Sequence, residues 1–346
     1  MDHLEWTITR IENENELTKS FYLKNSASNT VPYQAGQFLT FLFKDDMHEL
    51  RRSYSFSSTP GIDDISFITI KRITNGAISR HFHDHLSVGD KLKSLAPAGR
   101  FIIETKQGAR RQFCFIAAGS GIVPVFSLIK QLLKEEPLSE ILLLNQNHDE
   151  ESLIFSRQLF ECEHQFPNRF QNVNFLSNPT NKSLRSRRLT NDLLETRISK
   201  WVQPEKECFF YLCGPESFMR MAQFTLRLMG FSDGQIRREY FTVQFVPPPP
   251  LTLDHSVRTV QIFIAGHEYY FETKYPATIL QSALDLGIQL PYSCRGARCS
   301  TCMAKCTSGI VKMSMNEVLT DQDLEQGWVL TCVGYAASNI SLNFGD

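Results

Sequence analysis

Hydrophobic and polar positions alternate along much of residues 1–104. Segments 37–43 and 65–71 place apolar side chains at every second position, as does 53–57 over a shorter run, and turn residues separate these segments. A period of two is typical of strands that bury one face. Residues 1–104 are therefore predicted to form an antiparallel β-barrel domain that is closed or nearly closed.

The pattern changes near residue 105. Residues 113–118 form a continuous apolar run, followed by a glycine turn and by a helical period over 125–134. Runs 141–144 and 208–212 are continuously apolar as well. Strands that are buried on both faces have this pattern, and the order strand, helix, strand indicates a parallel sheet covered by helices. Residues 105–245 are therefore predicted to form an α/β domain.

Four consecutive prolines at 247–250 mark the clearest boundary in the chain. A proline run cannot continue a helix or a central strand, and it favours an extended, semi-rigid spacer. Residues 246–257 are therefore predicted to be a linker, and residues 258–346 a third domain. A rigid surface loop within one domain is the alternative.

Composition and charge exclude several classes of protein. The 346 residues include 36 lysines and arginines and 37 acidic residues, for a net charge of -1, so no nucleic-acid partner is expected. The most apolar stretch, 113–129, is interrupted by glycine and proline, so no membrane span is expected. The acidic first residues do not resemble a secretory signal. An odd count of nine cysteines argues against an export-type disulfide framework and favours a cytoplasmic protein with a metal or redox function.

The most informative stretch carries Cys294, Cys299 and Cys302, with Cys332 further along the chain. The spacing C-x4-C-x2-C followed by a distant fourth cysteine is that of plant-type [2Fe–2S] sites. A zinc site is the alternative, although zinc knuckles normally combine two C-x2–4-C motifs and this segment has only one such short motif. Cys306 is interpreted as a buried or incidental thiol, with ligand exchange at Cys302 as the other possibility.

The cysteine segment also carries a family resemblance. Residues 287–346, with the runs GIQLPYSC, RGARCSTC and GWVLTC, resemble the plant-type ferredoxin module that is fused to bacterial oxygenase reductases. They are most similar to reductase components of the phenylacetyl-CoA epoxidase and ketosteroid hydroxylase type. The resemblance implies an α+β (β-grasp) ferredoxin domain at 258–346, and a multidomain chain.

Residues 52–58, RSYSFSS, match the R-x-Y-S-x-S pattern of the ferredoxin-reductase flavin barrel. An arginine fork can hold a diphosphate through two hydrogen bonds, and a tyrosine ring can stack on isoalloxazine. Residues 71–79, KRITNGAIS, resemble the second flavin segment of that family, which FMN-binding members usually lack, so FAD is favoured. The predicted FAD-binding residues are Arg52, Tyr54, Ser55, Ser57, Lys71, Gly76, Ala77, Ile78 and Ser79.

Two further segments resemble the family's NAD(P)-binding domain. The run GSGIVP at 119–124 follows an apolar strand and precedes a helix, where amide groups and the helix N-terminus can bind a pyrophosphate. The run YLCGP at 211–215 also follows an apolar strand and resembles the family's Y-x-C-G-P. The predicted nicotinamide-binding residues are Gly119, Gly121, Pro124, Cys213, Gly214 and Pro215.

The resemblance also implies roles in hydride transfer. In relatives, the cysteine that corresponds to Cys213 lies beside the reacting atoms of nicotinamide and flavin. Glu239 resembles an acidic residue near that junction, with a solvated glutamate at the domain edge as the alternative. Tyr54 and Ser55 complete the set of predicted catalytic residues.

The choice between NADH and NADPH depends on a few positions. Asn178 stands where NADP-selective relatives commonly carry an arginine, which favours NADH. Arg185, Arg187 and Arg188 are close in sequence and could hold a 2′-phosphate, although a solvated basic loop explains them too. His148 also occupies a position where relatives often have arginine.

The three signatures imply an oxidoreductase that passes electrons from NAD(P)H to FAD, then to [2Fe–2S], and then to a separate partner. The expected partner is a separate multicomponent oxygenase, a hydroxylase or epoxidase. The sequence has no second metal set resembling a di-iron or Rieske site, so the chain is not expected to oxygenate substrate itself. A hybrid-cluster protein or a desaturase is an alternative acceptor, and a redox-sensing module is a different class of function. The proline spacer is expected to let the ferredoxin module alternate between flavin and partner.

Overall fold

The computed structural model describes residues 3–27, 31–44, 49–181, 183, 186–241 and 251–345. Contacts between residues divide the chain into two compact units. The first comprises Leu4–Pro97 and Phe101–Phe241, and the second comprises Met1–His3, Ala98–Arg100 and Thr242–Asp346. The prolines at 247–250 lie outside the described residues, so the linker and the domain boundaries stay predictions.

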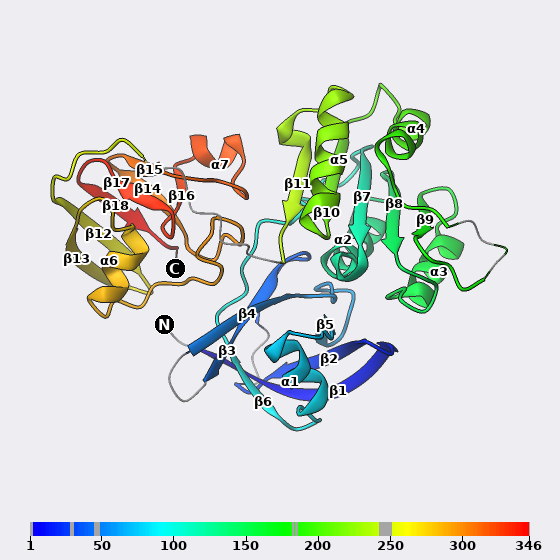
Figure 1. Cartoon of the computed structure of the whole chain (residues 1–346), viewed down its shortest axis with the longest axis horizontal. Coiled ribbons are helices and arrows are strands. Elements are labelled where there is room, and N and C mark those ends of the chain that lie inside the picture. Colours follow the sequence, from blue (N-terminus) through cyan, green and yellow to red (C-terminus); the bar gives the residue numbers. More distant parts are fainter. Residues whose placement is uncertain are drawn as a thin grey trace. The chain divides into compact units, whose positions relative to one another are not determined.

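The amino-terminal part of the first unit is an antiparallel sheet in the order β4-β3-β6-β1-β2-β5 (Figure 1). An isolated bridge between Phe56, just after β4, and Ile68 of β5 joins the two edges, so the sheet closes as predicted. Trp6 of β1 is buried inside, where its indole N–H donates a hydrogen bond of 2.8 Å to Ser94 Oγ. The elements are β1 (Leu4–Asn15), β2 (Thr18–Asn25), β3 (Phe38–Lys44), β4 (Glu49–Ser55), β5 (Ser66–Lys71), α1 (Ala77–Asp84) and β6 (Lys91–Ser94).

The rest of the first unit is a parallel sheet in the order β11-β10-β7-β8-β9, with helices on both faces (Figure 1). Phe113 and Phe115 of β7 pack in one core with α2 and α3, whereas Cys114 and Ile116 pack in another with α4 and α5. Burial on both faces explains why residues 113–118 show no polar alternation. The elements are β7 (Gln112–Ala118), the 3-10 turn Gly119–Gly121, α2 (Ile122–Glu135), β8 (Glu140–Asn147), α3 (Ser156–Gln165), β9 (Phe170–Leu176), α4 (Asn191–Trp201), β10 (Cys208–Cys213), α5 (Glu216–Leu228), the 3-10 turn Asp233–Gln235 and β11 (Ile236–Glu239).

The second unit contains a mixed sheet in the order β13-β12-β18-β14-β16 and a separate β15-β17 pair (Figure 1). Ile279 and Ala283 of α6 share a buried core with Val260 and Ile262 of β12, as an α+β ferredoxin fold requires. The elements are β12 (Arg258–Ile264), β13 (His267–Thr273), α6 (Ile279–Asp285), β14 (Met303–Ser308), β15 (Val311–Met313), α7 (Asp321–Glu325), β16 (Trp328–Leu330), β17 (Gly334–Ala336) and β18 (Ile340–Asn343).

Buried polar contacts join the barrel to the α/β domain within the first unit. Thr59 Oγ1 donates a hydrogen bond of 2.8 Å to the carbonyl of Ser127 in α2. Ser127 Oγ in turn donates a hydrogen bond of 2.6 Å to the carbonyl of Ser58. Lys130, also in α2, forms an ion pair with Asp63. These contacts hold α2, which follows the glycine turn of β7, against the segment that follows the R-x-Y-S-x-S motif.

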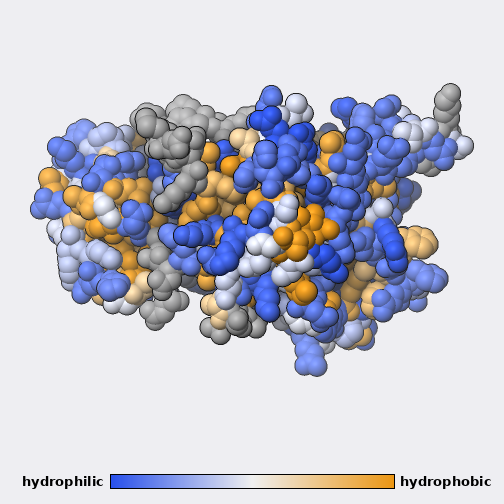
Figure 2. All heavy atoms as spheres, turned by 90° about the horizontal axis from the view of Figure 1, so that it is seen from below, coloured by the Kyte–Doolittle hydropathy of each residue, from blue (hydrophilic) through white to orange (hydrophobic). Residues whose placement is uncertain are grey.

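The surface mixes polar and apolar side chains. On the face that Figure 2 shows, hydrophobic atoms reach the surface in several places and are separated by hydrophilic ones. Leu228 of α5 and Phe160 of α3 are among the most exposed apolar side chains, at 73% and 68%. No helix among the described residues combines the length and the apolar character needed to cross a bilayer.

Candidate active site and cluster-binding loop

Strand β4 carries the predicted flavin motif. In its antiparallel register with β3, Arg52 lies opposite Phe41 and Tyr54 lies opposite Leu39, so both motif side chains project from one face of the strand. The Tyr54 ring meets Phe82 of α1 edge to face, with 5.2 Å between ring centroids. Burial raises the pKa of the Tyr54 hydroxyl. This face therefore offers an arginine fork beside a well-packed aromatic ring, as a diphosphate and a flat ring require.

Two of the predicted flavin residues, Ser57 and Lys71, do not lie on the face of β4 that carries Arg52 and Tyr54. Ser57 is fully buried, and its hydroxyl donates a hydrogen bond of 2.7 Å to Thr69 Oγ1 inside the barrel. Lys71 is half-buried at the end of β5, where its backbone pairs with Thr18. The structure thus gives Ser57 a packing role, and contact of either residue with flavin stays a prediction.

The second flavin segment forms the start of α1. Gly76 is the N-cap, and no side chain caps the helix. The first N–H groups of a helix lack partners within it, so those of Ala77, Ile78 and Ser79 can meet an anion. Ser79 Oγ donates a hydrogen bond of 3.1 Å to the Gly76 carbonyl and accepts one of 3.1 Å from the Ile73 N–H, which fixes the turn. The residues present fit the diphosphate of FAD.

Cys213 and Glu239 end the neighbouring strands β10 and β11 and are paired in register. Glu239 Oε1 accepts a hydrogen bond of 3.4 Å from Ser55 Oγ, whereas Oε2 has no partner among the described residues. Glu239 is only 8% exposed, and burial raises the pKa of its carboxyl to about 8. Burial and the nearby Glu239 also raise the pKa of the Cys213 thiol. Glu239 is therefore buried rather than solvated, and its unpaired oxygen fits a polar group on a bound flavin or nicotinamide.

The two glycine-containing turns of the α/β domain lie against each other. A Cβ atom at Gly121 would stand 2.0 Å from the Cys213 carbonyl oxygen, and one at Gly214 would stand 2.9 Å from the Ala118 Cβ. Only glycine allows this approach without a shift of the backbone. Since both turns follow parallel strands at their carboxyl ends, their amide groups share the edge where nucleotides bind in such sheets.

The other predicted nicotinamide residues lie at the same edge. Gly119 has a φ of 54°, in the left-handed region that favours glycine. Pro124 is in the first turn of α2, where a backbone N–H would have no partner within the helix, and Pro215 is the N-cap of α5. The structure brings this set together, and its contact with nucleotide stays a prediction.

The segment relevant to NADH or NADPH follows β8 and β9. The side chains of His148 and Asn178 approach each other, with 3.4 Å between His148 Nε2 and Asn178 Nδ2, and Asn178 N–H donates a hydrogen bond of 2.7 Å to the His148 carbonyl. Arg187 and Arg188 are exposed, and Arg185 lies outside the described residues.

The loop that contains three of the four predicted ligand cysteines has a distinctive backbone. The N–H groups of Gly296 and Arg298 both donate to Cys294 Sγ at 3.4 Å, and the Cys294 N–H donates to Cys299 Sγ at 3.4 Å. Amide groups that converge on sulfur are expected around an iron–sulfur cluster. Three residues of this loop other than glycine adopt a left-handed conformation: Arg295, Ala297 and Ser300, with φ of 52°, 58° and 53°.

The four cysteine side chains influence one another's ionisation. A hydrogen bond with Cys299 lowers the pKa of the Cys294 thiol, and a hydrogen bond with Cys332 raises that of Cys302. Thr331, which precedes Cys332, donates to the Cys302 carbonyl through both its N–H and its hydroxyl, at 3.2 and 2.9 Å. The spacing of these four cysteines along the chain is that of a plant-type cluster with two irons.

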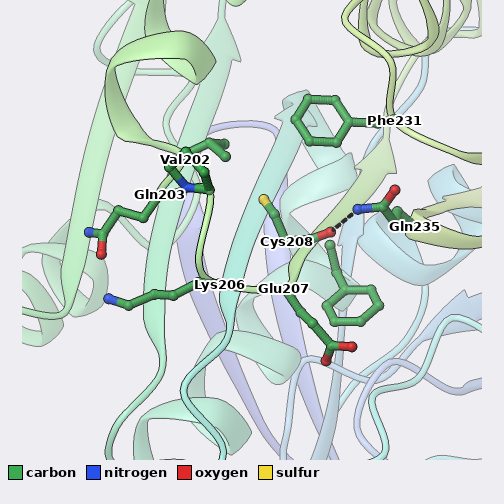
Figure 3. Close-up of a pocket in the computed structure, with 9 residues that line it drawn as sticks. Val202, Gln203, Lys206, Glu207, Cys208, Phe231 and Gln235 are labelled. Carbon is green, nitrogen blue, oxygen red and sulfur yellow. Dashed lines mark hydrogen bonds between the residues drawn. The ribbon is translucent and has the colours of Figure 1, made fainter.

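A cavity of about 350 Å³ lies at the other end of β10 (Figure 3). Cys208, the first residue of that strand, lines it, and Gln235 Nε2 donates a hydrogen bond of 3.0 Å to the Cys208 carbonyl. Cys213 and the nucleotide edge are at the last residue of the same strand. This cavity is therefore separate from the predicted nicotinamide site.

Three protein-family models match the chain in the order in which the sheets occur. An oxidoreductase FAD-binding domain matches residues 5–103. An oxidoreductase NAD-binding domain matches residues 115–223, and a 2Fe-2S iron-sulfur cluster binding domain matches residues 262–337.

Relatives match along nearly the whole chain. The ferredoxin reductase component of 3-ketosteroid-9-alpha-monooxygenase from Mycobacterium tuberculosis is 30% identical over 306 residues, covering 87% of this chain and 82% of that protein. This chain belongs to the ferredoxin-reductase-type family of oxygenase reductase components. A subunit of 1,2-phenylacetyl-CoA epoxidase from Escherichia coli is also similar, at 29% identity over 339 residues, covering 94% of this chain and 93% of that protein. The solved structure of phthalate dioxygenase reductase has the same fold, with a TM-score of 0.61, 22% identity, and coverage of 99% of this chain and 98% of that one.

Membership of this reductase family confirms the predicted cofactors and class of reaction. The chain is an NAD(P)H-dependent oxidoreductase with FAD and a [2Fe–2S] cluster. When bound, these groups convert a two-electron donor into single-electron transfers. The chain's own residues bind and orient the groups, and Glu239 can hold a proton at its carboxyl near neutral pH.

Sequence patterns did not predict the contacts that join the barrel to the α/β domain. Ser55 and Glu239 are 184 positions apart, and no local pattern pairs them. Ser58 accepts a hydrogen bond from Ser127 through its backbone carbonyl, which no sequence pattern marks, whereas the hydroxyl of Thr59 belongs to the run of hydroxyl residues that follows the flavin motif.

Proposed function

We propose that this chain is a cytoplasmic reductase that supplies electrons to a separate terminal oxygenase. The observation that carries the proposal is the junction of Ser55, Cys213 and Glu239, where the flavin motif meets the end of the nucleotide-binding strands within one compact unit. The same chain carries three cysteines in one loop and a fourth at Cys332, a set suited to [2Fe–2S]. One of the named relatives is the ferredoxin reductase component of a monooxygenase and another is a subunit of an epoxidase, which supports an oxygenase as the acceptor.

Each predicted flavin residue receives a role in this proposal. Arg52 and the first N–H groups of α1 bind the diphosphate, and the Tyr54 ring packs against isoalloxazine. Ser55 hydrogen-bonds the flavin. Lys71 lies at the edge of this site, and Ser57 fixes the strand from inside the barrel.

On the nucleotide side, the turns at 119–121 and 213–215 bind the pyrophosphate and position the nicotinamide. Cys213 contributes a buried, protonated thiol beside the reacting atoms. Glu239 holds a proton at Oε2 and exchanges it with the bound groups as they change charge. The proposed domains are residues 1–104 for FAD, 105–245 for NAD(P)H and 258–346 for the cluster, with 246–257 as the linker.

NADH is the proposed donor. Asn178 offers an amide rather than a cation to a 2′-phosphate, and His148 lies against it. Glu150, on the same loop as His148, is fixed as a carboxylate by the N–H groups of Thr180 and Asn181, which lowers its pKa to about 2. A permanent negative charge beside this segment disfavours a 2′-phosphate.

The test is reconstitution with purified oxygenases. We expect the purified protein to support NADH-dependent product formation by one terminal oxygenase, with a higher kcat/KM for NADH than for NADPH. The Cys332→Ser variant should still reduce ferricyanide with NADH but should fail to drive the oxygenase. Product formation that survives this substitution would contradict the proposed route of electrons.

The same preparation separates the alternatives. A redox-sensing module would show negligible steady turnover with ferricyanide or cytochrome c. A chain that serves a hybrid-cluster protein or a desaturase would turn over rapidly with those artificial acceptors and would reduce that partner rather than any oxygenase.

A further inference from the structure

The loop that carries the first three ligand cysteines contains two arginines in opposite surroundings. Arg295, directly after Cys294, is exposed, and its guanidinium lies 4.4 Å from the centroid of the Tyr292 ring. Arg298, directly before Cys299, is only 7% exposed. Among the described residues of the second unit, Arg298 is the one buried cation. Because water screens a buried charge less than an exposed one, Arg298 acts on its surroundings more strongly than Arg295 does.

The place of Arg298 in the loop limits how far its charge can lie from the ligand sulfurs. The Arg298 N–H donates to Cys294 Sγ at 3.4 Å. The backbone at this point is held in place, because the carbonyl of the buried Ala297 accepts a hydrogen bond of 3.3 Å from the Glu317 N–H. An extended arginine side chain carries its guanidinium about 7 Å from its own backbone nitrogen, so in any rotamer the positive charge lies within about 11 Å of the Cys294 sulfur.

A cation at this distance favours the reduced form of a [2Fe–2S] cluster. Reduction adds one electron, and with it one negative charge, and no bond to the protein forms or breaks. An arginine side chain keeps its positive charge in proteins. At an effective dielectric constant of about 20, two unit charges about 11 Å apart change an equilibrium constant by about tenfold. Any partner of the Arg298 side chain leaves the sign unaltered, because loss of the cation always makes the surroundings of the cysteines more negative.

We propose that Arg298 raises the reduction potential of the cluster by stabilising the negative charge that the reduced form gains. The inference rests on the proposed function and deepens it, because it assigns the residue that makes the cluster a better acceptor of single electrons from reduced flavin. Arg298 acts through its charge alone, so it is a positioning residue and not a catalytic one. Solvent exposure and net charge around the sulfurs are among the properties that set the potential of such clusters.

The experiment is a redox titration of the full-length protein, followed by the EPR signal of the reduced cluster. In Arg298→Gln, the ratio of reduced to oxidised cluster at a fixed potential should fall about tenfold, which is a shift of about 59 mV to more negative potential for one electron. Arg298→Lys keeps the charge and should restore most of the wild-type potential. Arg295→Gln removes an exposed arginine from the same loop and is the matched control, with little change in potential expected.

The outcomes are distinct. An unchanged potential in Arg298→Gln, or an equal shift in Arg298→Lys or in Arg295→Gln, would overturn the proposal. If Arg298→Gln holds no cluster, Arg298→Met, which keeps the apolar stem of the side chain, takes its place. Loss of the cluster in both variants would assign Arg298 to assembly of the site and would overturn the proposal too. Wild-type protein without any cluster signal would contradict the proposed function itself, whereas a normal signal with equal potentials in all variants would contradict only the role of Arg298.

Discussion

Ser55 Oγ donates a hydrogen bond of 3.4 Å to Glu239 Oε1. Ser55 is the last residue of β4 and Glu239 is the last residue of β11, so the bond joins the flavin motif to the edge strand of the parallel sheet. One hydroxyl at this distance compensates little of the cost of burying a carboxylate. Glu239 therefore favours its protonated form, and this preference has consequences for stability.

We expect Glu239→Gln to stabilise the protein increasingly as pH rises. The pKa of the Glu239 carboxyl increases on folding, from an ordinary 4.5 to about 8, mainly because of burial. The folded state therefore binds more protons than the unfolded state between these values. The stability that this proton binding contributes is fully present below about pH 4.5. Above that pH, the free energy of unfolding falls by at most about 1.4 kcal/mol per pH unit, up to about pH 8. Glutamine does not titrate, so the variant avoids this loss.

Thermal unfolding at several pH values between about 5 and 8 measures the effect. The difference in Tm between Glu239→Gln and wild type should grow across that range. Glu104→Gln removes an exposed carboxylate of the same unit and serves as the control. A difference in Tm that is constant with pH would show that the Glu239 carboxyl is ionised throughout.

Gly121→Ala should impair use of the nicotinamide nucleotide. The new Cβ would stand 2.0 Å from the Cys213 carbonyl oxygen, so one of the two turns must move. A displacement of about 1 Å in a positioning element can cost on the order of a hundredfold in kcat/KM. Steady-state kinetics with NADH and ferricyanide measure this loss. Gly234→Ala, whose Cβ would meet its nearest atom at 3.8 Å, should behave as wild type. Normal kinetics in Gly121→Ala would mean that the turn does not position the nucleotide.

Much of the fold could be predicted because the relevant patterns are local. Residues 113–118 lack polar alternation because β7 is buried on both faces, so the continuous apolar run alone predicts a buried strand. The four predicted ligand cysteines stand out because the first three occupy a single loop, with the spacing that plant-type clusters require. In each case the constraint acts between residues that are close in sequence.

The rest depends on pairings that sequence patterns do not encode. The parallel register of β10 and β11 sets Cys213 opposite Glu239, and the closure of one unit then brings Ser55 to the same carboxyl. Helix α1 was missed as a helix, although its first residues were assigned to flavin. It spans only eight residues, and tertiary packing of Phe82 stabilises so short a helix more than propensity does.

Cys332→Ser should abolish the cluster while leaving flavin reduction intact. Removal of one of four thiolates leaves an iron without its ligand, whereas the barrel and the parallel sheet belong to a different compact unit. We expect loss of acid-labile sulfide and of the EPR signal of the reduced protein, with reduction of FAD by NADH at the wild-type rate. Cys306→Ser is the control, because the Cys306 thiol is half-buried and donates to the Ser308 carbonyl at 3.3 Å. An altered EPR signal in that control would indicate ligand exchange at Cys302.

Arg111→Met should destabilise the α/β domain without changing the nucleotide site. Arg111 Nε donates a hydrogen bond of 3.2 Å to the fully buried carboxylate of Glu136, which Ser139 Oγ also bonds at 2.7 Å. Burial alone would raise the pKa of Glu136, but the hydrogen bonds from Arg111 and Ser139 hold it below its ordinary value. Loss of the guanidinium leaves a buried charge uncompensated, at a cost of about 3–5 kcal/mol in the free energy of unfolding.

Urea unfolding measures the cost of Arg111→Met, and its pH dependence identifies the cause. Glu136 in wild type contributes stability above about pH 4.5, and this is lost as pH falls through its lower folded-state pKa. In the variant, protonation of Glu136 removes the buried charge. The difference in the free energy of unfolding between wild type and variant should therefore decrease toward acid pH. Arg110→Met, at the exposed neighbouring position, should cost less than about 0.5 kcal/mol. If this difference in the free energy of unfolding does not depend on pH, the effect comes from lost packing of the Arg111 side chain rather than from the charge of Glu136.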